Sequence, residues 1–299
     1  MEQITTYLQN APLFSVGMIS ILIFVGFFVG FINTIAGMAT AISYALFMIM
    51  GLPINIANGT TRFGVLAQFI TSSVIFKKKG YLDVKIGTWV GIPVGIGALI
   101  GAEFVAILKP AIIETIMGIL LPIMAILLFL DMEKIIPALQ KIFTKGESSL
   151  QTNQQNTKQV TSLQTRSAIS NSASNTPPHY PLTWWKFIAF IIIGIYGGFT
   201  HAGVGLLIMF GSFFMIGLDL LRSNAIKQLA VVIYTPIALL IFIIHGQVNW
   251  PIALIYAIGN ILGGIAGSYA SIKGGAKFIK VAVAIVIFTM SGWLLFRNI

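Results

Sequence analysis

Residues 194–228 read GIYGGFTHAGVGLLIMFGSFFMIGLDLLRSNAIKQ, and residues 26–68 repeat this stretch in altered form. At one constant offset, five residues of the earlier stretch match the later one: Gly26, Gly30, Phe31, Gly37 and Ala57 align with Gly194, Gly198, Phe199, Gly205 and Ala225. A slightly shorter offset aligns Gly80, Gly97 and Gly101 with Gly246, Gly263 and Gly267. We therefore interpret the chain as two copies of one unit.

In each copy a short polar patch interrupts a glycine-rich apolar segment, NTIAG at 33–37 and THAGVG at 200–205. About a dozen apolar residues follow, which at ~1.5 Å per residue form roughly 20 Å of helix, against ~30 Å for the hydrocarbon core of a bilayer. We predict half-helices, as in transporters whose site lies where two helix breaks face each other. The alternative is a pair of ordinary short helices whose glycines allow close packing. We favour the broken helices, because backbone groups freed at membrane depth need partners.

Composition sets the class of protein. With 57% hydrophobic residues, 9% charged residues and a mean hydropathy of +0.93, the chain is predicted to be an all-α polytopic membrane protein. The net charge of +10 does not indicate nucleic-acid binding, because the basic residues lie in short loops between apolar segments. The chain has no cysteine, which excludes disulfides, thiolate metal sites and thiol catalysis.

We predict two membrane repeats, 1–130 and 184–299, joined by a tether at 131–183 that is rich in Gln, Asn, Ser and Thr. Ten apolar segments are expected, five in each repeat: 13–33, 38–50, 58–76, 84–108, 111–130, 184–199, 206–218, 225–244, 251–272 and 278–296. Two of them carry glycines at every fourth position, which favours close helix packing: Gly87, Gly91 and Gly95, then Gly259, Gly263 and Gly267.

Charge placement predicts the orientation. If Lys77, Lys78 and Lys79 are cytoplasmic, successive crossings place all of the 18 Lys and Arg residues inside except three: Arg62, Lys109 and Arg297. The protein is then a multi-pass protein of a bacterial-type plasma (inner) membrane, with both termini external and the tether cytoplasmic. Because each copy has five segments, the second copy begins on the opposite side, and the repeats are predicted to be inverted.

Several of these motifs carry a family resemblance. The second copy, with GGFTHAGVG, GLDLLRSNAIKQ and HGQVNWPIALIYAIGNILGGIAGS, resembles the C-terminal half of the sulfite exporter TauE/SafE family of anion transporters. The first copy agrees in FINTIAGMA, GLPINIANGTTRFGVLAQ and KKKG. It departs at AGMATAISYALF, where the family usually has a run of glycines and then a proline. The resemblance implies export of sulfite, sulfonates and related small sulfur oxyanions.

The breaks are the expected binding site. An oxyanion at membrane depth must exchange its water shell for fixed donors, and half-helix N-termini supply free N–H groups and positive dipole ends. The candidate contacts at the breaks are Asn33, Thr34, Gly37, Thr40, Thr200, His201, Gly203 and Gly205. For each of the polar side chains, helix capping or packing is the alternative role. An imidazole at a break is either a donor to the anion or a pH-sensitive group.

A second set of candidates follows each half-helix, and each contains one cation. The residues are Asn58, Thr61, Arg62 and Gln68 in the first copy and Asn224, Lys227 and Gln228 in the second. The alternative for Arg62 and Lys227 is that both snorkel to opposite membrane interfaces. We favour a role in binding, since each cation follows its half-helix at a similar distance.

The motifs favour a secondary transporter over other classes. The chain lacks HExxH, GxSxG and a pair of mid-membrane carboxylates, so no enzymatic activity is expected, and it lacks the GxxxxGK[ST] of a nucleotide-driven pump. No cofactor is expected, and a metal transporter is disfavoured because the breaks lack Asp, Glu and Cys. An anion channel, a uniporter or an importer of a related oxyanion such as thiosulfate stays open. The expected partners are the oxyanion and the lipid bilayer, with no nucleic acid.

Overall fold

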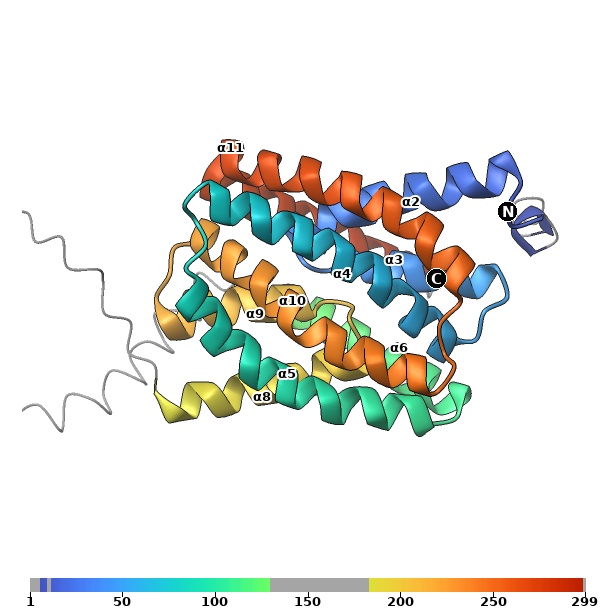
Figure 1. The fold of residues 1–299 in the computed structure, drawn as a ribbon, viewed down its shortest axis with the longest axis horizontal. Coiled ribbons are helices and arrows are strands. Elements are labelled where there is room, and N and C mark those ends of the chain that lie inside the picture. The colour runs from blue at the N-terminus through green and yellow to red at the C-terminus, as the bar shows by residue number, and fades with distance from the viewer. Residues whose placement is uncertain (1–5, 10–11, 130–182, 298–299) are drawn as a thin grey trace, which may run out of the picture. The chain divides into compact units, whose positions relative to one another are not determined.

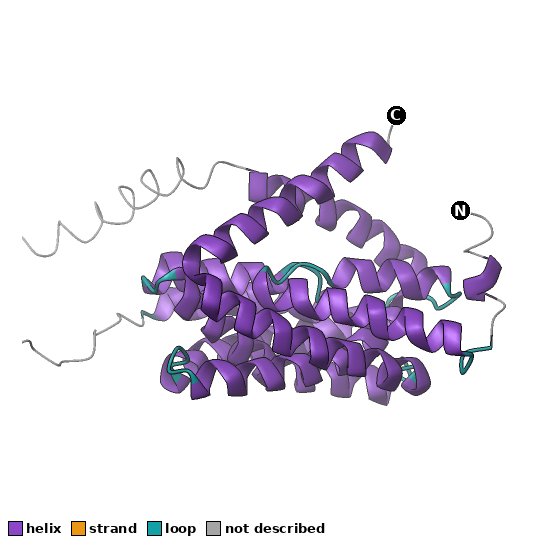
Figure 2. Ribbon diagram, turned by 90° about the horizontal axis from the view of Figure 1, so that it is seen from above, coloured by secondary structure: helices purple, strands orange, loops and turns teal. Residues whose placement is uncertain are grey.

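The structure is a computed structural model, and it describes residues 6–9, 12–129 and 183–297. Within this part every regular element is a helix, as Figure 2 shows, which confirms the predicted all-α class. The helices are α2 (Val16–Ile35), α3 (Thr40–Ile49), α4 (Ile54–Lys78), α5 (Val84–Ile107), α6 (Pro110–Phe129), α8 (Trp184–Phe199), α9 (Val204–Gly211), the π-helix η2 (Ser212–Ile216), α10 (Leu220–Ile244) and α11 (Trp250–Arg297). The predicted tether, apart from Thr183, lies outside the described residues.

Both predicted interruptions are present. The helix α2 ends at Ile35 and the 10-residue α3 follows from Thr40, whereas α8 ends at Phe199 and the 8-residue α9 follows from Val204. At ~1.5 Å per residue, α3 is roughly 15 Å long and cannot cross a bilayer. By length and composition, four helices of the described part can cross one: α2, α5, α10 and the first 30 residues of α11.

The helix α11 covers two of the predicted segments. Its backbone is not helical at Gly275, where φ is 62° and ψ is −161°, so two helices meet at this glycine. Glycine adopts a positive φ without steric penalty, and a junction here matches the predicted gap between 272 and 278.

Helices from the two halves of the chain pack on each other. The helix α2 lies along α11, which also packs on α4, and α8 lies along α5, which also packs on α10. We call α2, α4 and α11 the first helix group and α5, α8 and α10 the second helix group; Figure 1 shows them in its upper and lower parts. The two groups meet where α4 contacts α10. Each group therefore contains helices from both halves.

Glycines allow the closest of these contacts. A Cβ added at Gly263 of α11 would lie 2.7 Å from the backbone nitrogen of Phe31 in α2. In the second helix group, a Cβ at Gly101 of α5 would lie 2.8 Å from the backbone nitrogen of Phe199 in α8. The predicted close packing is confirmed at Gly263, whereas Gly101 was not among the predicted positions. The triplet Gly87, Gly91 and Gly95 instead faces side chains of α10.

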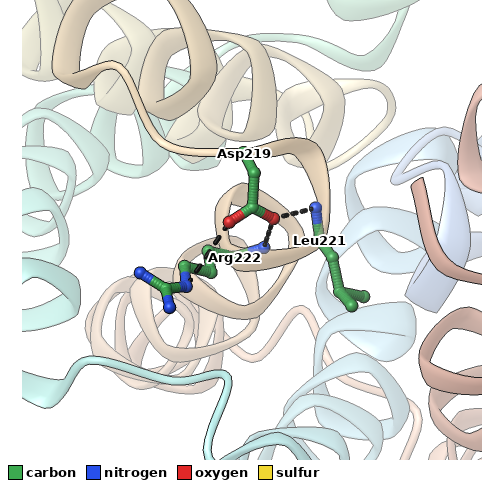
Figure 3. Close-up of polar contacts among 3 residues, drawn as sticks. All are labelled: Asp219, Leu221 and Arg222. Atoms are coloured by element: carbon green, nitrogen blue, oxygen red, sulfur yellow. Dashed lines mark hydrogen bonds and ion pairs between the residues drawn. The ribbon is translucent and has the colours of Figure 1, made fainter.

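The helices α4 and α10 begin earlier than expected. The helix α10 starts at Leu220 rather than 225, because the Asp219 carboxylate accepts hydrogen bonds from the backbone nitrogens of Leu221 (3.0 Å) and Arg222 (2.9 Å), as Figure 3 shows. Similarly, α4 starts at Ile54 rather than 58. Of the added residues, Ile54 and Ala57 in α4 and Ser223 and Asn224 in α10 are buried, whereas Arg222 is exposed.

Candidate functional site

The two helix breaks meet at a pair of glycines. A Cβ added at Gly37 would lie 2.6 Å from both the carbonyl carbon of Gly205 and the nitrogen of Leu206, and one added at Gly205 would lie 2.9 Å from the Cα of Gly37. Gly37 has a φ of +77°, and Gly203, the residue before α9, has a φ of +84°. This contact brings together the N-terminal ends of α3 and α9, as the sequence predicts for two facing half-helices.

Asn33 closes the first break. Its Oδ1 accepts a hydrogen bond from the backbone nitrogen of Ala39 at 2.9 Å, and its Nδ2 donates to Oγ1 of Thr40 at 2.9 Å. Both side chains are buried. The capping alternative therefore describes what Asn33 does in this conformation, since its amide satisfies donors at the start of α3.

Thr34 and Gln68 form a second polar contact at the end of α2. Nε2 of Gln68 donates to Oγ1 of Thr34 at 2.9 Å and to the carbonyl of Gly30 at 3.1 Å, and the Thr34 hydroxyl also donates to that carbonyl at 2.8 Å. Oε1 of Gln68 is buried and has no hydrogen-bond partner in the part of the chain that the structure describes.

Lys227 reaches the carbonyl end of α2. Its Nζ donates to the carbonyl oxygens of Asn33 at 3.1 Å and Thr34 at 2.8 Å, and Nε2 of Gln228 donates to the Thr34 carbonyl at 3.0 Å. The same Nε2 contacts Oδ1 of Asn224 at 3.1 Å. Nδ2 of Asn224 is buried without a partner, which leaves one donor of the cluster free.

Arg62 donates hydrogen bonds to the carbonyl end of α8, as Lys227 does to that of α2. Its Nη1 donates to the carbonyl of Gly197 at 3.2 Å and its Nη2 to that of Gly198 at 2.6 Å. Asn58 completes the arrangement, because its Nδ2 donates to the Phe199 carbonyl at 2.9 Å while its Oδ1 accepts from Nε of Arg62 at 3.2 Å. The guanidinium also lies 4.9 Å from the ring centroid of Phe242.

His201 is held by two tyrosines at the second break. Its backbone nitrogen donates to the hydroxyl of Tyr44 at 3.0 Å, and its Nδ1 lies 2.5 Å from the hydroxyl of Tyr234. The neighbouring Thr200 accepts a hydrogen bond from the backbone nitrogen of Ala202 at 3.3 Å. The hydroxyl of Thr61, in contrast, donates to the carbonyl of Asn58 in its own helix, at 2.8 Å.

Three aromatic residues of the site were not among the predicted contacts. Tyr44 and Tyr234 bind His201, and the ring of Phe69 lies 6.1 Å from the His201 ring and 6.0 Å from Nζ of Lys227. The ring of Phe69 therefore lies near both His201 and the ammonium group of Lys227. A tyrosine within a half-helix, as at Tyr44, was the available signal; nothing in the sequence distinguished Phe69 from other apolar residues.

The basic side chains of the site are buried. The side chains of Arg62 and Lys227 are 0% exposed, and that of His201 is 2% exposed. The snorkelling alternative is therefore wrong for both cations, and Arg62 does not belong to the external face on which the charge count placed it. No Asp or Glu is buried among the residues whose burial is described, and they include no cluster of three or more His, Asp or Glu that could hold a metal.

Comparisons with known proteins cover nearly the whole chain. The chain is 24% identical over 269 residues to the probable membrane transporter protein ORF9 of Sinorhizobium sp, and the matched region covers 90% of this chain and 89% of that protein. It is 22% identical over 283 residues to a probable membrane transporter protein of Haemophilus influenzae, covering 94% and 96%. No solved structure matches the chain. The family described as sulfite exporter TauE/SafE matches residues 22–294, and the chain belongs to this family of multi-pass membrane transporters.

Proposed function

We propose that the protein exports a small sulfur oxyanion, sulfite or an organosulfonate, across the plasma membrane. The anion binds between the N-terminal ends of α3 and α9, near the middle of the bilayer. One observation carries this proposal: Arg62 and Lys227 are fully buried at the helix breaks, and among the residues whose burial is described no Asp or Glu is buried to balance them. Charges at membrane depth are costly unless they are paired. A transported anion supplies the missing negative charge.

The charges agree with such a ligand in sign and size. Arg62 and Lys227 contribute two positive charges, the carbonyl ends of α2 and α8 about −0.5 each, and the N-terminal ends of α3 and α9 about +0.5 each. The centre then carries about +2, which suits an anion of one or two negative charges. The free Nδ2 of buried Asn224 offers a hydrogen-bond donor.

Direction follows from the membrane potential. Each negative charge that leaves a cell with a negative interior gains ~2.3 kcal/mol per 100 mV. Export of the anion is therefore favourable without a second ion. The burial of the whole site supports a carrier that opens to one side at a time, because a continuously open pore would expose these side chains.

Flux through purified protein in liposomes tests the function. Sulfite efflux should saturate with sulfite concentration and show counterflow. It should also increase when the interior of the liposome is made electrically negative. Arg62→Gln and Lys227→Gln, matched for amount, should lose most of this flux, whereas Lys85→Gln, an exposed lysine at the start of α5, should keep it. Flux that rises linearly without saturation would identify a channel. Normal sulfite flux in both Arg62→Gln and Lys227→Gln would show that the two cations do not take part in anion binding.

Inverted repeats are part of the proposal, and the pairing of α2 with α11 and of α8 with α5 supports them, since these pairs correspond in the aligned sequences. The chain has no cysteine, so single cysteines can report topology. In intact cells, an impermeant thiol reagent should label His245→Cys at the end of α10 and not Lys79→Cys at the end of α4; both positions are exposed. Labelling of both from outside would contradict the inversion.

A further inference from the structure

Each carbonyl end of the interrupted helices α2 and α8 is closed by a cation from the other half of the chain. Lys227, in the second half, donates to the carbonyls of Asn33 and Thr34 in α2. Arg62, in the first half, donates to the carbonyls of Gly197 and Gly198 in α8. An amide accompanies each cation: Gln228 donates to the Thr34 carbonyl that Lys227 also binds, and Asn58 donates to the carbonyl of Phe199, next to those that Arg62 binds. Each end thus receives a cation and an amide from the other half of the chain.

Such carbonyl ends are suited to bind a cation. The last carbonyls of a helix lack partners within the helix and carry about half a negative charge together. In transporters with interrupted helices, these ends coordinate the Na+ or proton that is transported together with the substrate. In this protein both ends are already satisfied by side chains that cannot leave.

Further oxygens surround the Lys227 end. Oε1 of Gln68 and Oε1 of Gln228 are buried without partners, and the Nε2 atoms of both residues bind Thr34. The carbonyls of Asn33 and Thr34 are paired with Lys227 and Gln228, so the two Oε1 atoms are the acceptors of this cluster that no donor among the described residues satisfies. Oxygen-rich clusters of this kind are what hard cations prefer as ligands.

We propose that Arg62 and Lys227 take the place of a co-transported cation: each is a fixed counter-charge at the carbonyl end of one interrupted helix, and the anion therefore moves without Na+. The proposal rests on the proposed anion transport. It assigns the two side chains a positioning and charge-balancing role at the carbonyl ends, while the anion binds at the N-terminal ends of α3 and α9.

Ion replacement in the wild-type protein is the first test. Sulfite efflux from liposomes, with the voltage clamped and the pH equal on both sides, should have the same rate in Na+ and in choline medium. In a separate experiment with a pH difference across the liposome membrane, collapse of the proton gradient should leave the efflux rate unchanged. A rate that depends on Na+ or on the proton gradient would overturn the proposal, because a mobile cation would then be required.

Chemical rescue is the second test. Lys227→Ala removes the ammonium and its stem, and sulfite flux should fall by at least about tenfold, since acceptors are left unpaired in the interior. Either ethylammonium, present at equal concentration on both sides, or Na+ should restore the sulfite flux of this variant. Lys227→Met loses the charge but fills the space, so neither ion should rescue it. Lys85→Ala is the matched control and should transport normally without added amine.

Thermal unfolding in detergent gives a readout that needs no transport. Ethylammonium or Na+ should raise the melting temperature of Lys227→Ala and leave those of the wild type and Lys227→Met unchanged. An alanine variant that is folded but gains neither flux nor stability from either ion would overturn the proposal; if it does not fold, the ion-replacement test decides. Wild-type protein that moves no sulfur oxyanion, while the stabilisation is observed, would instead refute the proposed function alone.

Discussion

The contact between Gly37 and Gly205 makes Gly37→Ala the most informative single substitution for the geometry of the site. Gly37 has a φ of +77°, where an L side chain costs about 1–2 kcal/mol. The new Cβ would also lie 2.6 Å from two backbone atoms of the facing break, which cannot rotate away. Overpacking of this kind costs about 1–3 kcal/mol. The expected total is ~2–5 kcal/mol, a large share of the stability of a typical protein.

Two further variants separate the contributions. Gly51 has a φ of +89°, and nothing lies within 4 Å of an added Cβ, so Gly51→Ala carries the backbone strain alone. Gly205 lies within the helix α9, and an added Cβ would lie 2.9 Å from the Cα of Gly37, so Gly205→Ala carries the contact alone. Gly37→Ala should be destabilised by about the sum of the two.

Melting temperatures in detergent, measured at equal protein concentration, give the order of the three variants. We expect Gly37→Ala to melt lowest, and to lose sulfite flux because the two half-helix ends are pushed apart. Gly51→Ala should transport at the wild-type rate once the amount in the membrane is matched. A Gly37→Ala variant as stable as Gly51→Ala would show that the two breaks do not touch, and would refute the facing arrangement of α3 and α9.

Three further substitutions test individual contacts. Tyr234→Phe removes the hydroxyl that lies 2.5 Å from Nδ1 of His201; it should lower stability by about 1 kcal/mol and reduce sulfite flux, and unchanged flux would take this pair out of the site. Phe69→Ala removes a fully buried ring and should cost about 3–5 kcal/mol, measured by thermal unfolding against Phe69→Leu, which should cost less. Asp219→Ala removes the cap of α10 and should cost about 1 kcal/mol without affecting flux per molecule, whereas Asp219→Asn should keep most of the cap's effect; equal loss in both would point to the ion pair with Arg222 instead.

Repetition in the sequence predicted the interruptions, because glycines and short polar patches recur at the same offset in both copies. The half-helices follow from segment length, since 13 apolar residues cannot cross a bilayer. The predicted segments began four and five residues after the starts of α4 and α10, and in α10 this is because Arg222, Ser223 and Asn224 lower the hydropathy of the first turn. A hydropathy criterion treats such a turn as a loop, although the Asp219 carboxylate starts the helix here by accepting hydrogen bonds from Leu221 and Arg222.

The partners of the cations could not be predicted. Arg62 and its acceptor Gly198 are 136 residues apart, and Lys227 and Thr34 are 193 apart. Every residue has a backbone carbonyl, whatever its side chain. No sequence pattern therefore marks a particular carbonyl as the acceptor of a hydrogen bond. The place of Phe69 in the site could not be predicted either, because its proximity to Lys227 and His201 comes from the tertiary fold, and any apolar residue would fit the pattern of its helix.

Each helix group contains helices from both halves of the chain, and this has a consequence for the protein during its synthesis. Ser43, near the start of α3, binds the hydroxyl of Tyr256 in α11, which follows 213 residues later. At a synthesis rate of about 5–20 residues per second, the ribosome needs roughly 10–40 s to reach that residue. During this time the glycine face of α2 and the polar side chains of α4 are in the membrane without their partners. A chain that stops before α11 therefore leaves the first half permanently incomplete, and quality-control proteases should remove it even though all of its own segments are intact.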